Sequence, residues 1–248
     1  RSRRLLADYF EMVEVVSGNF VEPKGNVRMT APVTFGRLHV LPTLCCFLEA
    51  NPLIDVGLQL SDTIIDLNAE EFDLALRIGV VSTPSLVVRR LGTVSWWTLA
   101  SPEYLERNGR LCTTRDIAGH RWIQHSNLLQ PARLPHQLFG SDAVPVRERL
   151  AVNDAAAALE AAIRGVGVVT ALSYQAAEHV ANGKLVRVLV DFEPAPLPVA
   201  LVFPETRRTI ERVRRLVDYL AFELSELLKL ENHPALRLKA GKASSITP

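Results

Sequence analysis

Apolar residues follow two different periods along this chain, and the alternation between the two indicates an α/β fold. Over residues 35–50 they recur every three or four positions, which predicts an amphipathic helix. Pro42 is expected to kink this helix or delay its start, because proline lacks the backbone N–H that a helix interior uses. Shorter apolar runs predict strands over residues 26–30, 54–60, 72–78, 86–91 and 94–100, the last two divided by Gly92. With a short helix at 64–70, the order is βαβαβ, which favours a mostly parallel sheet.

The same alternation starts again after Ser101-Pro102, with predicted helices at 103–107, 155–164 and 173–181. Asn153 is the expected N-cap of the middle helix and Gly165 its stop. Further strands are predicted at 120–124, 149–152, 166–171, 185–189 and 199–203, before a long helix at 207–229.

Two chain crossings, at 100–102 and 194–198, predict two lobes joined by a two-stranded hinge. Residues 25–100 and 199–229 would form the first lobe, and residues 101–198 the second. Residues 230–248 are polar and lack periodicity, so a disordered tail is expected there.

An apolar seam marks the first predicted helix, Arg1–Phe20, which a linker to residue 24 follows. The seam consists of Leu5, Tyr9, Met12 and Val16. Its spacing suits a partner helix in a coiled coil, and packing against the chain's own body is the alternative.

Composition limits the function classes. The 248 residues are 48% hydrophobic and carry a net charge of +1 without a long basic stripe, which is globular composition without the electrostatic footprint of a nucleic-acid binder. No apolar run reaches membrane-spanning length, and residues 1–50 lack the apolar core of a signal peptide. The three cysteines do not suggest a disulfide framework, so a cytoplasmic location is expected.

Motifs that would carry catalysis are missing, so neither an enzyme nor a cofactor is expected. Gly165-Val-Gly167 lacks the further residues of a nucleotide loop and is interpreted as a helix stop before a strand. Cys45-Cys46 would suit a soft metal or an oxidation sensor, although one core thiol beside one rim thiol is the simpler interpretation. The acidic residues are interpreted as a solvated helix rim rather than a metal cluster: Asp62, Asp66, Glu70, Glu71 and Asp73.

Binding chemistry is better supported. Helix N-termini near Thr34 and Asn153 each follow a strand, and their positive dipole ends would point into one cleft if the two lobes face each other. The hydroxyls of Thr63 and Ser101 and the charge of Arg77 also fall near strand ends. Together these groups favour a small anion such as a carboxylate, whereas each one singly is explained by capping or a surface salt bridge.

Six motifs in series resemble the effector-binding domain of LysR-type transcriptional regulators, from about Gly25 to Leu228. They are Thr30-Ala-Pro-Val-Thr-Phe-Gly-Arg-Leu-His39, Leu60-Ser-Asp62, Phe72-Asp-Leu-Ala-Leu-Arg-Ile-Gly79, Ala100-Ser-Pro-Glu-Tyr-Leu105, Ile117-Ala-Gly-His120 and Val152-Asn-Asp154 with Gly165-Val-Gly167. The resemblance implies a periplasmic-binding-protein-like fold (type II) of two Rossmann-like lobes, with a small effector in the cleft. Carried over by position, the effector-binding residues are Pro32, Val33, Thr34, Asp62, Thr63, Arg77, Ile78, Ser101, Asn153, Gly167 and Thr170.

The resemblance also implies partners. The first helix looks like the end of the family's linker helix, which forms a coiled coil, so a homodimer or homotetramer is expected. DNA binding is implied only for a longer protein, through a winged helix-turn-helix domain that these 248 residues do not contain. We therefore expect the effector-sensing domain of a transcriptional regulator, with no membrane partner. A transporter's solute-binding protein and an enzyme on the same scaffold are the alternatives.

Overall fold

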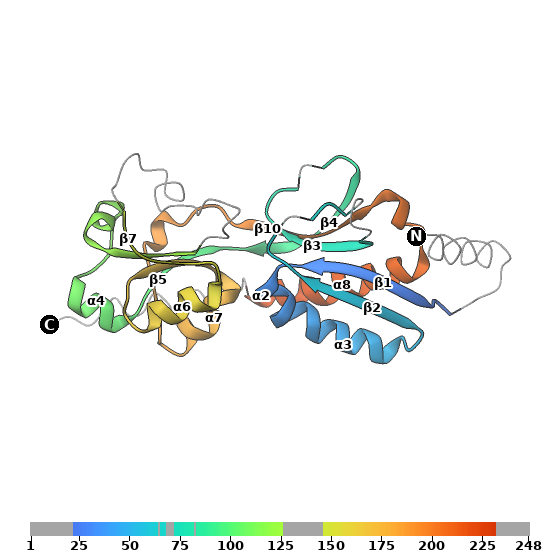
Figure 1. Cartoon of the computed structure of the whole chain (residues 1–248), viewed down its shortest axis with the longest axis horizontal. Coiled ribbons are helices and arrows are strands. Elements are labelled where there is room, and N and C mark those ends of the chain that lie inside the picture. Colours follow the sequence, from blue (N-terminus) through green and yellow to red (C-terminus); the bar gives the residue numbers. More distant parts are fainter. Residues whose placement is uncertain (1–21, 64, 68–71, 82, 126–145, 232–248) are drawn as a thin grey trace. The chain divides into compact units, whose positions relative to one another are not determined.

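The protein forms two compact units, each built on a five-stranded sheet (Figure 1). The computed structural model describes residues 22–63, 65–67, 72–81, 83–125 and 146–231. The first unit takes its described residues from Arg1–Gly92 and Pro198–Lys229, and the second takes its described residues from Thr93–Leu197 and from the segment that begins at Leu230. The predicted helix at 1–20 and the predicted tail from 232 lie outside the described residues.

The sheet of the first unit has the strand order β2-β1-β3-β10-β4. Strand β1 pairs in parallel with both β2 and β3, whereas β10 runs antiparallel to β3. The prediction of a mostly parallel sheet was therefore only partly right, because β10 returns late in the chain to pair antiparallel with β3. The strand bounds are Gly25–Ala31 for β1, Ile54–Leu60 for β2, Leu74–Ile78 for β3, Leu86–Val94 for β4 and Leu197–Pro204 for β10.

One continuous helical run follows β1, made of α2 (Val33–Phe35), the π-helical η1 (Gly36–Val40) and α3 (Leu41–Ala50). It starts before Phe35, so the late start considered for Pro42 was wrong. The N–H of Leu41 reaches back five residues to the carbonyl of Gly36. This wider turn lies immediately before Pro42. In a regular α-helix, the ring of a proline would clash with the carbonyl four residues earlier.

The core of the first unit lies on both faces of its sheet. On one face, α3 lies beside α8 (Glu211–Glu231), with the rings of Phe47 and Tyr219 centred 5.3 Å apart. On the other, residues from the segment after β2 pack against β3 and β10, forming a cluster of Ile65, Leu67, Phe72, Ala75, Ala200 and Val202. Residues 65–67, which were predicted to be helical, are not helical, and the remainder of that prediction lies largely outside the described residues.

The sheet of the second unit has the strand order β7-β6-β8-β5-β9. Strand β6 is parallel to β7 and β8, and β5 is antiparallel to β8 and β9. The bounds are Trp96–Ala100 for β5, Arg121–His125 for β6, Arg147–Val152 for β7, Val168–Leu172 for β8 and Val186–Val188 for β9. Residues 96–100 were assigned to the first lobe from sequence, but the structure pairs them in this sheet.

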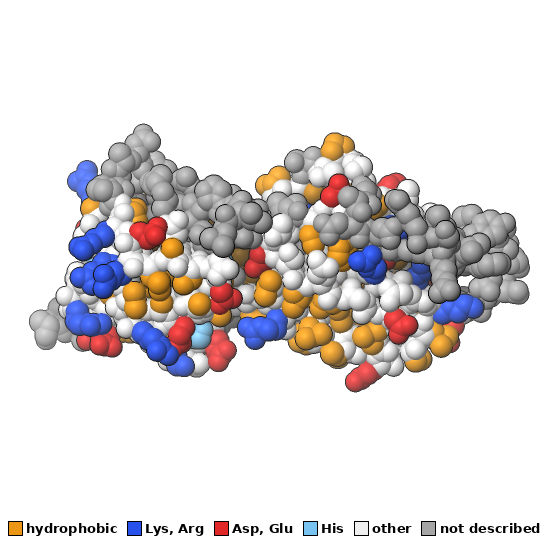
Figure 2. All heavy atoms as spheres, in the orientation of Figure 1, with side chains coloured by type: hydrophobic (Ala, Val, Ile, Leu, Met, Phe, Trp, Pro, Cys, Tyr) orange, Lys and Arg blue, Asp and Glu red, His pale blue; other side chains and the backbone are white. Residues whose placement is uncertain are grey.

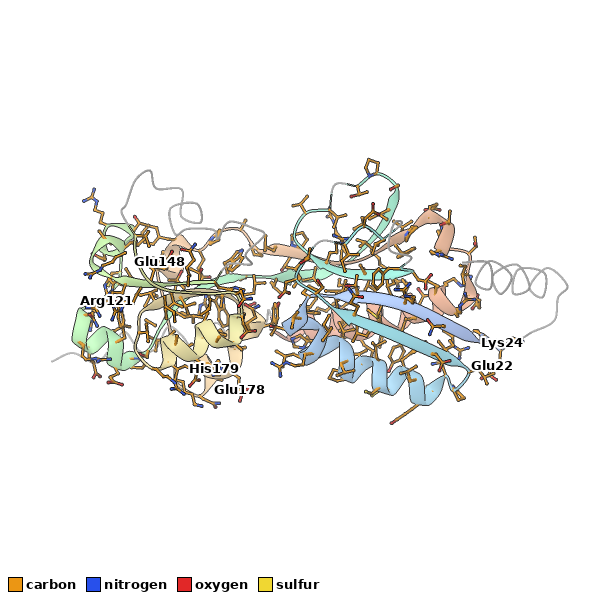
Figure 3. The ribbon with its side chains drawn as sticks, viewed as in Figure 1. Glu22, Lys24, Arg121, Glu148, Glu178 and His179 are labelled. Carbon is orange, nitrogen blue, oxygen red and sulfur yellow. The ribbon has the colours of Figure 1, made fainter. Side chains whose placement is uncertain are left out.

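In the described part of this unit, the helical segments longer than a single turn are α4 (Pro102–Asn108), the 3₁₀ segment η2 (Thr114–Gly119), α6 (Ala155–Ile163) and α7 (Ser173–Ala181). Single 3₁₀ turns lie at Val190–Phe192 (η3) in this unit and at Glu205–Arg207 (η4) in the first. In Figure 3, Arg121 and Glu148 mark β6 and β7, Glu178 and His179 mark α7, and Glu22 and Lys24 lead into β1.

Gly92 does not split two strands as predicted, because β4 continues through it to Val94. A Cβ at Gly92 would lie 3.0 Å from the Cβ of Leu228, so the glycine permits close approach of α8 to β4. Among the described residues, no helix is both long and apolar enough to cross a membrane.

Candidate functional site

The carboxyl ends of β1 and β2 are tied together where the chain enters α2. Pro32 is the N-cap of α2 and provides no side-chain acceptor. The carboxylate of Asp62, just beyond β2, instead accepts a hydrogen bond from the N–H of Val33 at 3.0 Å. The N–H of Ser61 donates to the carbonyl of Ala31 at 2.9 Å. These two contacts fix the turn after β2 against the start of the helix.

Asp62 changes the expected chemistry of this helix start. The sequence suggested an open N-terminus that would attract an anion. The structure places an internal carboxylate on the first N–H, so part of the positive end of the helix dipole is already compensated. Asp62 is itself exposed. A second carboxylate at this point would meet a like charge.

Hydroxyl groups lie beside this carboxylate. Thr34 is half-buried in the first turn of α2, and Thr63 is exposed in the turn after β2, where its N–H donates to the Ser61 hydroxyl at 3.2 Å. Apolar side chains of the same helical run also reach the surface, namely Val33, Leu38 and Leu41. In Figure 2, hydrophobic side chains gather on the surface where Figure 1 draws α2 and α3.

Arg77 supplies the positive charge, from the carboxyl-end half of β3. One terminal nitrogen of its guanidinium donates to the carbonyl of Ile65. Its Nε is buried and has no acceptor among the described residues. Partial burial lowers the pKa of Arg77, and the nearby charge of Asp66 opposes that shift. The neighbouring candidate Ile78 is also half-buried and pairs with Val199 of β10.

The predicted residues of the second unit have mostly structural roles. Ser101 is 3% exposed and caps α4, because its hydroxyl accepts from the N–H of Tyr104 at 3.3 Å. The N-cap of α6 is Asp154, which accepts from the N–H of Ala157 at 2.7 Å, so the capping role predicted for Asn153 was wrong. Asn153 is exposed just beyond β7.

Gly167 and Thr170 belong to the strand β8 region. A Cβ at Gly167 would lie 2.5 Å from the carbonyl oxygen of Arg121, so the missing side chain lets the chain entering β8 approach that of β6. Thr170 is half-buried and pairs with Thr98 of β5. Gly165 ends α6 at φ +71°, as its predicted role as a helix stop requires.

Two buried ion pairs, one in each unit, were not predicted from the sequence. Asp73 was assigned to a solvated rim, yet it is 1% exposed: its carboxylate accepts from the N–H of Arg28 at 2.9 Å and pairs with Arg207 at 3.2 Å. In the second unit, Arg187 makes a bidentate pair with Glu193 and lies over the ring of Trp97, 4.5 Å from its centroid. The sequence signal for Asp73 was its place at the start of an apolar strand.

The predicted dimerisation residues Leu5, Tyr9, Met12 and Val16 lie outside the described residues. The expectation that one of Cys45 and Cys46 is buried was wrong: both are free and exposed, as is Cys112. Within the described ranges, no three His, Cys, Asp or Glu side chains gather in a way that would hold a metal ion.

Comparison with known proteins decides the family. A family model described as the LysR substrate binding domain matches residues 21–224. The chain belongs to the LysR substrate-binding domain family. Its LysR resemblance, inferred from six short motifs, is thereby confirmed.

The regulatory domain of CrgA, a LysR-type transcriptional regulator from Neisseria meningitidis, has the same fold, with a TM-score of 0.70 at 24% identity over 82% of this chain and 100% of that one. The effector domain of AmpR from Pseudomonas aeruginosa also has it, with a TM-score of 0.68 at 21% identity over 84% and 100%.

Two curated relatives of this LysR domain extend beyond the matched region. An uncharacterized HTH-type transcriptional regulator of Haemophilus influenzae is 27% identical over 84% of this chain and 72% of its own length. An HTH-type transcriptional regulator of Xanthomonas campestris is 30% identical over 82% of this chain and 60% of its own length.

Proposed function

We propose that this LysR substrate-binding domain senses a small polar effector for a transcriptional regulator, and that the first unit binds it at the carboxyl ends of β1, β2 and β3. The relatives are named as HTH-type transcriptional regulators, which supports a role of the whole protein in controlling transcription. In this proposal, a helix-turn-helix segment binds DNA, and the seam of Leu5, Tyr9, Met12 and Val16 pairs two copies.

The observation that carries the proposed site is the meeting of three adjacent strand ends. Strand β1 lies between β2 and β3, so Asp62, Val33 and Arg77 come from neighbouring strand ends of one sheet. The threonine hydroxyls of Thr34 and Thr63 lie at the same ends. Carboxyl ends of strands are where open α/β sheets bind ligands. In the second unit, Asn153 and Thr170 remain candidates, whereas Ser101 and Gly167 contribute through the fold.

Effector binding would act by shifting an equilibrium between conformations or assemblies. An effector moves such an equilibrium only to the extent that it binds one state better than the other. The proposal therefore predicts that a bound effector changes DNA affinity of the full-length regulator as well as the stability of this domain.

The first test replaces two hydroxyls by methyl groups of similar size. A library of small polar metabolites is screened by thermal shift on the 248-residue chain, and hits are measured by calorimetry. We expect Thr34→Val with Thr63→Val to weaken binding of a hit about thirtyfold, since two lost hydrogen bonds at about 1 kcal/mol each cost about 2 kcal/mol. The melting temperature without ligand should stay near that of the wild type, because both side chains are at least partly exposed.

A matched double variant in the same unit is available as a control. Thr206 and Thr209 are exposed and follow β10. Because β10 runs antiparallel to β3, it ends beside the amino end of β3 rather than its carboxyl end. Thr206→Val with Thr209→Val should leave the dissociation constant unchanged. Equal affinities of all three proteins would place the site elsewhere.

A further inference from the structure

Two neighbouring strands in the sheet of the second unit each begin with an arginine. Strand β6 begins at Arg121 and β7 at Arg147, and the parallel register places these two residues directly beside each other. Neighbouring strands lie about 4.8 Å apart, and residues in register point to the same face of the sheet. Two positive charges therefore lie side by side, an arrangement that destabilises a sheet unless an opposite charge compensates it.

No carboxylate of the described residues compensates these two charges. Both arginines are exposed, and neither forms an ion pair with a residue that the structure describes. Glu148 follows Arg147 in the chain, but its register partner is Trp122. Because side chains alternate along a strand, Glu148 points to the opposite face of the sheet from the arginine pair.

Exposed arginines of the first unit have carboxylate partners instead. Arg208 pairs with Glu205 at 2.9 Å, and Arg214 pairs with Glu211. The net charge of +1 for the whole chain therefore conceals a local excess of positive charge in the second unit.

Further arginines surround the pair. Arg149 is also exposed and is the residue that the register between β6 and β7 passes over. Arg107 and Arg121 flank the segment after α6: a Cβ at Gly165 would lie 2.5 Å from a terminal nitrogen of Arg107, and a Cβ at Gly167 would lie 3.5 Å from the Cβ of Arg121. In Figure 2, Lys and Arg side chains gather on the part of the surface where Figure 3 labels Arg121.

The end of α6 explains only part of this positive charge. Gly167 lies beside Arg121 shortly after α6 ends, so the negative end of the helix dipole is near. That end is equivalent to about half a negative charge. Arg164 already lies on it as the C-cap residue. The helix end therefore does not balance three further exposed arginines.

We infer that an arginine cluster, formed by Arg121, Arg147 and Arg149, binds the phosphate backbone of DNA. Contacts of this kind are independent of sequence and position a protein on the duplex. The planar guanidinium group matches a phosphate with two parallel hydrogen bonds. The inference rests on the proposed function, because the relatives are named as HTH-type transcriptional regulators and such a regulator works on DNA. The sensor domain then adds a contact of its own to that of the helix-turn-helix segment.

The test uses the 248-residue chain without any added DNA-binding domain. Its binding to a fluorescently labelled duplex of about 24 base pairs is measured by fluorescence anisotropy between about 20 and 100 mM salt. Each arginine that neutralises one phosphate contributes about 0.9 to the slope of log affinity against log salt concentration. We therefore expect a slope of about −2.7 for three arginines.

Variants assign the binding to the arginine cluster. Arg121→Gln with Arg147→Gln should change the slope to about −0.9 and weaken binding at the lowest salt concentration by about tenfold or more. Arg121→Lys with Arg147→Lys keeps both charges and should stay within about threefold of the wild type, because backbone binding depends mainly on charge. The control, Arg208→Gln with Arg214→Gln, removes the same net charge from the first unit and should leave the slope unchanged.

The melting temperature distinguishes DNA binding from a purely structural role. If the arginines only compensate the end of α6, Arg121→Gln with Arg147→Gln should lower the melting temperature and leave DNA affinity unchanged. If they form a binding surface, the same variant should melt at an equal or higher temperature at low salt, because the repulsion between the two charges is relieved.

Several results would overturn the inference. They are no binding of the duplex at the lowest salt concentration, an equal loss in the control variant, and the purely structural outcome above. Tighter binding of polyglutamate than of a duplex with the same number of charges would indicate an acidic polypeptide as the partner. Displacement of the duplex by millimolar inorganic phosphate at constant ionic strength would indicate a site for a small anion.

The proposed function fails separately, because its test uses no DNA. If an effector binds and Thr34→Val with Thr63→Val weakens it, while the duplex does not bind, only the arginine cluster is wrong. If the duplex binds through the cluster and the threonine variant binds an effector like the wild type, only the proposed effector site is wrong.

Discussion

The strand ends of the two units look alike in sequence and differ in what their polar residues do. In the first unit, Thr34, Asp62 and Thr63 are exposed or half-buried at the surface beyond β1 and β2. In the second, the hydroxyl of Ser101 is buried as the cap of α4, and Gly167 is packed against the backbone of Arg121. Placement at a strand end therefore does not by itself make a residue available to a ligand, and the free hydrogen-bonding capacity of the side chain decides.

The largest expected effect separates buried from exposed carboxylates. Asp73→Ala leaves the N–H of Arg28 without its side-chain acceptor and removes the buried partner of Arg207. We expect a loss of about 3 kcal/mol in the free energy of unfolding, since breaking a buried pair leaves a partly uncompensated charge. Asp55→Ala, at an exposed position of β2, should change stability by less than about 0.5 kcal/mol. Denaturant unfolding measures both, and equal losses would contradict the distinction.

Gly167→Ala tests whether the close approach of β8 to β6 in the second unit stabilises the fold. Its new Cβ would lie 2.5 Å from a backbone oxygen, which cannot move aside as a side-chain end would. Overpacking of this kind costs about 2 kcal/mol. Gly119→Ala is the control, because a Cβ there would meet no atom within 4 Å. If both variants unfold at the wild-type denaturant concentration, the close approach of β8 to β6 is not required.

Ser101→Ala compares a capping hydroxyl with the exposed hydroxyls of the first unit. Loss of the cap on α4 should lower the free energy of unfolding by about 1 kcal/mol. The effector dissociation constant should not change, because the hydroxyl is buried and engaged with the N–H of Tyr104. Weaker effector binding at unchanged stability would return Ser101 to the site and weaken the contrast between the units.

The smallest effect concerns pH and the first unit alone. Partial burial of His39, whose ring packs against Phe35 in the helix that starts at the site, lowers its pKa below the usual 6.5. The unfolded chain then binds a proton more readily than the folded one, so this contribution to stability is complete above about pH 6.5 and is lost as the pH falls toward the folded-state pKa. The melting temperature of the wild type should therefore fall more steeply between pH 7 and pH 5 than that of His39→Gln. Parallel curves would show that His39 does not contribute.

Much of the fold could be predicted from local pattern. The bounds of β2 and α7 were predicted to the residue, and Gly165 ends α6 as expected, because apolar period and glycine chemistry act over a few neighbouring positions. The sheet to which a strand belongs is not local. Residues 96–100 were assigned to the wrong sheet, because strand pairing depends on segments far along the chain such as β8 and β9.

The candidate site divides in the same way. Residues at strand ends, such as Thr34 and Arg77, could be selected from sequence, because the change from an apolar strand pattern to a turn or helix pattern marks where the strand ends. Two facts could not be predicted from the sequence. The carboxylate of Asp62 accepts a hydrogen bond from the N–H of Val33, 29 positions earlier, and Asp73 is buried. Both depend on which turn lies over which strand.

The sequence by itself determined the α/β class, the resemblance to the family and the approximate positions of most elements, since each follows from short-range periodicity and motif order. Only the tertiary structure decided which polar residues are consumed by the fold. A carboxylate or hydroxyl becomes a cap, a buried ion pair or a free group according to the donors that distant segments bring to it, and burial makes an unmet hydrogen bond costly. In this protein, the start of α2 is therefore not an open anion site, because its first N–H already donates to Asp62.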